Sequence, residues 1–123
     1  MAGTIVANTI NTDTGLFSTN NAYLGIAKAW VNFVGSSGTT NASFNVSSVT
    51  RVGAGQYTIN FTTAMPNIYY VTTTAASNNS TSGVQTGAFC WGTQTTTTTN
   101  IATTNGAANI QDQAVAYVAV FSS

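Results

Sequence analysis

Side chains that could carry acid–base chemistry are few in this chain. Its 123 residues include no His and only four charged residues: Asp13, Lys28, Arg51 and Asp112. Two carboxylates can hydrolyse a glycosidic bond when the fold holds them about 5–10 Å apart, which would require Asp13 and Asp112 to meet. Ser, Thr and Tyr hydroxyls are abundant, but no imidazole is present to activate one as a nucleophile. The sequence therefore predicts that the protein is not an enzyme.

The same scarcity of charge bears on metals, nucleic acids and membranes. Calcium normally needs two or more carboxylates and thiolate zinc sites need several cysteines, whereas this chain has two acidic residues and one Cys. Nucleic acids and anionic surfaces attract clustered cations, and Lys28 and Arg51 lie far apart in the sequence. No apolar run approaches the roughly 18 residues of a membrane helix. We therefore predict no metal, no cofactor, no nucleic-acid partner and no membrane insertion.

Isolated polar residues have ordinary structural interpretations. Lys28 and Arg51 are interpreted as solvated or edge charges that discourage strands from aggregating. For Lys28, at the start of an aromatic strand, a cation–π or structural contact is the alternative. Asp112 is expected to lie at the entry to the last strand, or to cap it. Cys90, between two aromatic residues, is interpreted as a small buried hydrophobic side chain and not as a reactive thiol.

Aromatic rings beside amides and hydroxyls are the remaining candidates for a binding site. Thr, Asn, Ser and Gln make up 54 of the 123 residues, and aromatics make up 11%. Most aromatics fall in expected strands, where core packing is their default role. Rings exposed beside polar loops would suit a carbohydrate, because sugars stack on aromatic faces and bond to amides. The candidates for contact with a cell-surface glycan are Tyr69, Tyr70 and Trp91, with the loops at residues 77–83 and 92–105.

Alternation of apolar and polar residues predicts β-strands along most of the chain. Strong helix formers are nearly absent, while Thr, Val, Ile, Phe and Tyr dominate. Strands are expected at residues 27–34, 42–49, 56–62, 68–75, 84–91, 94–100 and 114–121. The last of these is apolar throughout, so we expect both of its faces to be buried, one of them by a neighbouring subunit.

A glycine turn and a distinct N-terminal segment indicate how these strands are arranged. Gly53 and Gly55 can supply the positive φ angles of a tight turn, which makes residues 42–62 an antiparallel hairpin. Residues 1–25 are interpreted as an arm for attachment or subunit exchange, and residues 26–123 as the folded domain. The predicted fold is all-β: a small antiparallel, jelly-roll-like β-sandwich. Because strands with so few charges must bury surface between subunits, we expect a homotrimer.

Several stretches of sequence carry a family resemblance. They read KAWVNF at residues 28–33, ASFNVSSV at 42–49, GQYTINFTTAMP at 55–66 and YVAVF at 117–121. Together they resemble a β-domain family of bacteriophage (cyanophage-like) tail-fibre and related virion proteins. Arg51 and Val52 stand where that family commonly has Asp-Asn, and Gln56 stands where it commonly has Asp. These departures affect a turn and the start of a strand.

This resemblance implies an exposed, trimeric virion domain without catalytic residues. The predicted function is a short trimeric tail fibre or knob, attached by its N-terminal arm to tail or baseplate proteins and binding host-surface glycan through distal loops. The alternative is a capsid decoration (cement) protein that binds the major capsid protein and stabilises the head lattice. A free lectin-like or hydrolytic domain is the weakest reading. Residues 1–11 lack the pattern of a signal peptide, so assembly is expected in the host cytoplasm, followed by location on the virion.

Overall fold

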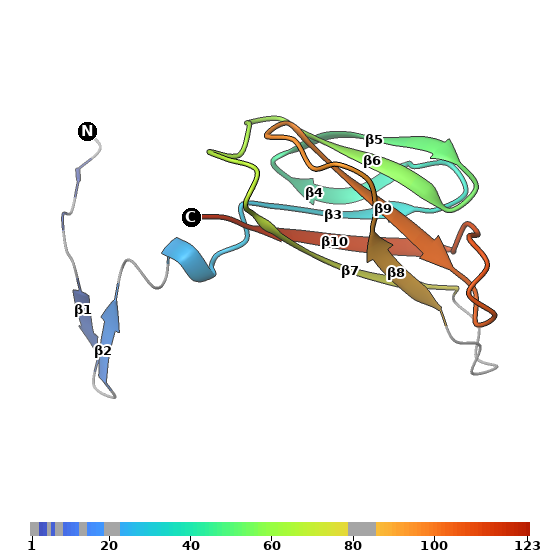
Figure 1. Cartoon of the computed structure of the whole chain (residues 1–123). Helices are drawn as coiled ribbons and strands as arrows, with labels where there is room; N and C mark the ends of the chain where they lie inside the picture. Colours follow the sequence, from blue (N-terminus) through green and yellow to red (C-terminus); the bar gives the residue numbers. More distant parts are fainter. Residues whose placement is uncertain (1–2, 5, 7–8, 13–14, 19–22, 79–85) are drawn as a thin grey trace.

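Two antiparallel four-stranded sheets pack face to face (Figure 1). The computed structural model describes residues 3–4, 6, 9–12, 15–18, 23–78 and 86–123, with the backbone alone described for 9–12 and 15–18. Sheet I has the order β4-β3-β10-β7, formed by Thr40–Phe44, Ala29–Val34, Val115–Phe121 and Val71–Ser77. Sheet II has the order β5-β6-β9-β8, formed by Val46–Gly53, Gln56–Phe61, Thr98–Thr104 and Gly87–Cys90. The predicted all-β sandwich is confirmed.

Three of the seven connections within the sandwich are hairpins inside one sheet, and the other four cross between the sheets. β3 pairs with β4, β5 with β6, and β8 with β9, each time as consecutive antiparallel strands. A jelly roll, in contrast, is built from two Greek keys. The strand order therefore shows a sandwich, and it does not show the jelly-roll-like path expected from the sequence.

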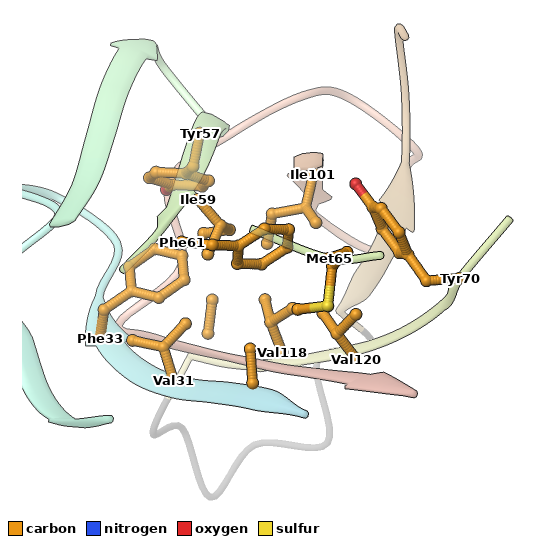
Figure 2. Close-up of a cluster of buried hydrophobic side chains, with 12 residues drawn as sticks. Val31, Phe33, Tyr57, Ile59, Phe61, Met65, Tyr70, Ile101, Val118 and Val120 are labelled. Atoms are coloured by element: carbon orange, nitrogen blue, oxygen red, sulfur yellow. The ribbon is translucent and has the colours of Figure 1, made fainter. Parts of the chain in front are cut away.

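Alternating side chains from both sheets form the core. In β6 the inward residues Tyr57, Ile59 and Phe61 are buried, as their alternation predicted. Figure 2 shows these side chains directed toward residues of β3 and β10, including Val31, Phe33, Val118 and Val120. The Phe33 ring meets the Tyr57 ring edge-on, with centroids 4.8 Å apart. The sandwich interior is therefore closed by aromatic and β-branched packing.

The expected hairpin at residues 42–62 is wrong in its first half. The chain changes sheets at Asn45, which has a φ of 54° and separates β4 from β5. The Asn45 amide holds this bend by donating to the Lys28 carbonyl (3.0 Å) and by accepting from the Thr63 N–H (2.7 Å). β4 consequently pairs with β3, and Phe44 is exposed instead of facing the core. Alternation continues through the bend because both halves are extended.

Two further strands begin later than expected, since side chains capture the preceding backbone. β7 starts at Val71, not at residue 68, because the Asn67 side chain accepts from the Tyr69 N–H (2.8 Å). β9 starts at Thr98, not at residue 94, because the Thr95 hydroxyl accepts from the N–H groups of Thr97 and Thr98. Hydrogen bonds of this kind compete with strand pairing. The run of five threonines is therefore a turn followed by a strand.

β10 lies in the middle of sheet I, with one face in the core. Ala116, Val118 and Val120 are buried, whereas Tyr117 on the opposite face is exposed. Within a single chain the expected burial of both faces is therefore not observed. Its completion by a neighbouring subunit stays a prediction.

The N-terminal residues form a separate small sheet. β1 (Thr9–Thr12) pairs with β2 (Gly15–Ser18) in an antiparallel hairpin that Figure 1 draws apart from the sandwich. A single helical turn at residues 23–25 precedes β3. Among the described residues there is no helix with the length and hydropathy needed to span a bilayer.

Candidate functional site

Tyr70 is a core residue, which corrects its assignment as a glycan contact. It is 4% exposed, and its ring packs edge-on against Phe61 with centroids 5.8 Å apart. Its hydroxyl donates to the carbonyls of Thr95 (2.9 Å) and Thr98 (2.7 Å), so it holds the threonine turn in place. Burial raises the pKa of this phenol. A ring enclosed in this way has no face for a sugar.

Tyr69 and Trp91 are exposed and lie at the same end of the sandwich. Tyr69 is 86% exposed and Trp91 is 38% exposed. The Cys90 thiol lies 3.7 Å from the Thr72 carbonyl, which brings the segment of Trp91 beside the start of β7. The Trp91 indole N–H donates to the Ile101 carbonyl (3.0 Å) and so holds the ring against sheet II. Their role in glycan contact stays a prediction.

The two segments expected to bind a glycan are only partly loops among the described residues. Residues 91–97 lie beside the start of β7, whereas Ser77 ends β7 about 20 Å away, at 3.3 Å per residue. Most of the loop at 77–83 falls outside the described residues. In the loop at 92–105, residues 98–104 form β9, where Thr99 and Thr103 are fully buried. Residues 91–97 therefore lie at the other end from Ser77, whereas the end of β9 at Thr104 pairs with Gly87.

Strand register also decides which end is near the N-terminal arm. Ala29, at the start of β3, pairs with Val120, and Val71 pairs with Phe121. We call this the arm end, since the chain enters β3 here (Figure 1). Tyr69 and Trp91 lie at the arm end, whereas Ser77 lies at the opposite end, so a receptor contact distal to the arm stays a prediction that does not include these two rings. The reason is topological: β7 runs parallel to β3 and starts at the same end.

The opposite, far end is held by a carboxylate that the sequence analysis treated as a strand cap. Asp112 accepts from the Arg51 guanidinium (2.6 Å), the Gly55 N–H (2.7 Å) and the Tyr57 hydroxyl (2.8 Å). Hydrogen bonding from Arg51 lowers the pKa of Asp112, while burial raises the pKa of Tyr57 to about 12. Gly55 has a φ of +66°, and a Cβ there would lie 2.5 Å from the Gln111 nitrogen. The cluster clamps the β9–β10 loop onto the β5–β6 hairpin.

The structure also shows the surroundings of the other charged residues and of the thiol. Arg51 lies exposed on the edge strand β5, as expected, and is in addition the ion-pair partner of Asp112. The Lys28 ammonium lies over the Tyr23 ring, 3.4 Å from its centroid, and donates to the Tyr23 carbonyl. Cys90 is exposed, although its thiol turns toward Thr72 and burial of that group raises its pKa. Asp13 lies outside the described residues, so its separation from Asp112 is not measured.

Phe89 is a binding candidate that the sequence analysis missed. It is 43% exposed and pairs with Ala102 on the outer face of sheet II. Trp91 follows two residues later, and its backbone N–H donates to the Asn100 carbonyl (3.2 Å). Because residues two apart in an extended chain point to the same side, the two rings lie on the same face. Thr58 donates to the Asn100 side chain (2.7 Å) alongside them. Two exposed rings therefore lie beside an amide and a hydroxyl on the outer face of sheet II.

The two outer faces of the sandwich differ in chemistry. On sheet II, the Asn60 amide donates to the Ser48 and Thr50 hydroxyls, so polar side chains bond to one another across strands. On sheet I, the Asn41 amide likewise donates to the Asn32 side chain (2.9 Å), but the outward positions of the four strands carry no charge. Instead they carry large side chains that are between 40 and 60% exposed: Trp30, Phe44, Val71 and Tyr117. We call these four residues the apolar face.

A groove of about 650 Å³ opens at the arm end. Much of its lining is apolar and comes from Tyr23, Ile26, Phe44, Ala64, Met65 and Pro66. Lys28, already engaged by Tyr23, is the charged residue in this lining. The groove thus extends the exposed apolar surface of sheet I past Phe44 toward the end of the sandwich.

In the described part of the chain, no three residues of the His, Cys, Asp and Glu types lie close enough to hold a metal ion. No protein-family model, curated protein or solved structure matches the chain. No family is therefore assigned to it.

Proposed function

We propose that this chain is a structural protein of a bacteriophage particle, assembled as a homotrimer that serves as a short tail fibre or knob. The observation that carries the proposal is the apolar face of sheet I. Soluble monomers seldom leave a contiguous apolar patch open to water, and larger ones mark interaction sites. Because this face has no charge to complement, a second copy with the same uncharged surface is a fitting partner.

The size of this face is consistent with one part of an interface. Four strands about 4.8 Å apart and six residues of about 3.3 Å each give a projected area of about 400 Å². A specific interface buries about 800 Å² on each partner. Further contact must therefore come from outside the apolar face.

The assignment to a virion rests on the resemblance in sequence. Its motifs coincide with structurally important segments: KAWVNF covers β3, and ASFNVSSV spans the change of sheet at Asn45. The same motifs contain Trp30 and Phe44, and the terminal YVAVF contains Tyr117. Motif residues thus supply three of the four side chains of the apolar face.

A glycan contact fits the outer face of sheet II in this proposal. Once sheet I is covered by other copies, the platform of Phe89 and Trp91 is the aromatic surface that stays open on the other side of the sandwich. Tyr69 remains an exposed candidate at the arm end.

A capsid decoration protein is the second candidate. It is favoured by the placement of the arm, the groove and Tyr69 at one end of the sandwich. A protein that binds a lattice through one end would concentrate its contacts in this way, whereas a receptor-binding tip would place them opposite the attachment.

Localisation on the particle separates the two candidates. Antibody labelling in electron micrographs, with quantitative mass spectrometry for copy number, should place a few to tens of copies at the tail. Hundreds of copies on the head would overturn the fibre and establish the decoration role. Absence from purified particles would overturn both. Light scattering on the purified chain tests the trimer, which a stable monomer would refute.

A further inference from the structure

The groove at the arm end and the β1–β2 hairpin are two incomplete surfaces of the same chain. We infer that the groove receives the β1–β2 hairpin of a second copy, so that the subunits are joined by exchanged arms. This inference rests on the homotrimer proposed above and names the contact that completes it.

The groove favours an apolar, uncharged occupant. Tyr23, Ile26 and Phe44 line it while remaining substantially exposed, and Pro66 adds a rigid apolar wall. The Lys28 ammonium is already engaged by the Tyr23 ring and carbonyl. A volume of about 650 Å³ accommodates several side chains at once. An acidic or basic ligand would find no matching charge cluster among the described residues here.

The β1–β2 hairpin lacks a surface to pack against. In its backbone register Ile10 lies directly opposite Phe17, so the hairpin carries an apolar cross-strand pair. A two-stranded hairpin is marginally stable in water unless it packs against another surface. Its strands pair with each other in a sheet separate from the sandwich. The hairpin therefore requires a surface that its own sheets do not provide.

Geometry favours a second copy over the hairpin's own groove. Tyr23 and Ile26, which connect toward β3, already form one wall of the groove. Figure 1 shows the hairpin displaced from the sandwich beyond this connection. Reciprocal exchange lets every copy fill one groove and donate one hairpin. It also adds to the apolar face the contact area that a stable interface lacks.

Matched substitutions in the full chain test the exchange. Ala64→Asp places a charge in the groove at an exposed position, and Phe17→Asp places one on the hairpin. The control is Ala54→Asp, which makes the same Ala-to-Asp change at an exposed position of the far end. By light scattering we expect the unaltered chain and Ala54→Asp to be trimers. Each of the other two variants should associate at least tenfold more weakly, while Phe17→Leu retains the trimer.

Mixing the two deficient variants distinguishes exchange from self-binding. A Phe17→Asp chain keeps an intact groove, and an Ala64→Asp chain keeps an intact hairpin. With different affinity tags, each should capture the other when mixed, although neither captures its own kind. Absence of capture would overturn exchange and point to the hairpin's own groove or to another virion protein.

The controls keep failure of this inference distinct from failure of the trimer. If both charged variants remain trimers, exchange is refuted and the trimer stands. If the unaltered chain is a monomer, the trimer itself is refuted, and exchange with it. Circular dichroism verifies that each variant is folded. If Phe17→Leu remains a trimer, the loss of association in Phe17→Asp is due to the introduced charge.

Discussion

Replacing Asp112 by Ala tests whether one carboxylate holds the far end of the sandwich. Its oxygens accept from the Gly55 N–H (2.7 Å) and the Tyr57 hydroxyl (2.8 Å), and both donor residues are buried. A buried donor left without its acceptor costs about 1–3 kcal/mol. The Arg51 ion pair adds little, because the guanidinium faces solvent. We therefore expect the free energy of unfolding to fall by about 2–4 kcal/mol.

Thermal unfolding followed by circular dichroism measures this loss. For a domain of this length, each kcal/mol of lost stability lowers the unfolding temperature by about 4–5 °C. The midpoint should therefore fall by about 8–20 °C. The variants are compared at one protein concentration, because assembly makes the midpoint depend on concentration.

Two further variants show where the loss originates. Arg51→Gln should lower the midpoint much less than Asp112→Ala, since it removes only the exposed partner. Tyr57→Phe combined with Asp112→Ala should recover part of the loss, because the hydroxyl is removed together with its acceptor. If Arg51→Gln costs as much as Asp112→Ala, or if the double variant shows the sum of the single losses, the buried-donor account is wrong.

The same bonds set the pH limits of the folded state. Hydrogen bonding from Arg51 holds the pKa of Asp112 below its usual value. The stability supplied by the ionised carboxylate is thus present above about pH 4 and lost as pH falls through the lowered pKa. Burial raises the pKa of Tyr57 to about 12, so stability present below about pH 10 is lost as pH rises through that value. The midpoint should be nearly constant between about pH 5 and 9, and a strong change within that window would contradict this account.

Two other predictions concern close backbone contact and the glycan platform. Gly35→Ala should cost about 2–4 kcal/mol in urea unfolding, because its Cβ would lie 2.0 Å from the Gln113 carbonyl oxygen. Gly25→Ala, where a Cβ meets nothing within 4 Å, should change stability little, and an equal loss would contradict the steric reason. Trp91→Ala, alone or with Phe89→Ala, should inhibit phage adsorption about tenfold less well than the unaltered protein. Undiminished inhibition would exclude the platform.

Much of the fold could be predicted because alternation is a local property. Tyr57, Ile59 and Phe61 occupy every second position of β6, and a strand sends such residues to one face. The same pattern could not locate the change of sheet at Asn45, because alternation passes through the bend unchanged. Phe44 was therefore expected in the core and is found outside it.

The candidate site was less predictable than the strands. Alternation correctly places Tyr69 and Tyr70 on opposite sides of the chain, but only packing against Phe61 decides that Tyr70 is the buried one. Phe89 has a local signal in its spacing from Trp91, although the exposure of both rings depends on which face of β8 the sheets enclose. No local signal could reveal that the aromatic candidates lie at the arm end.

By itself the sequence determined the all-β composition, the near absence of charge and the inward positions of most strands. These follow from side-chain chemistry and a repeat of two residues, which need no knowledge of distant contacts. Only the tertiary structure decided that Arg51 and Asp112, 61 residues apart, form an ion pair, and that Trp30, Phe44, Val71 and Tyr117 are exposed together on sheet I. Such features depend on which strands become neighbours, and that choice minimises the free energy of the whole chain.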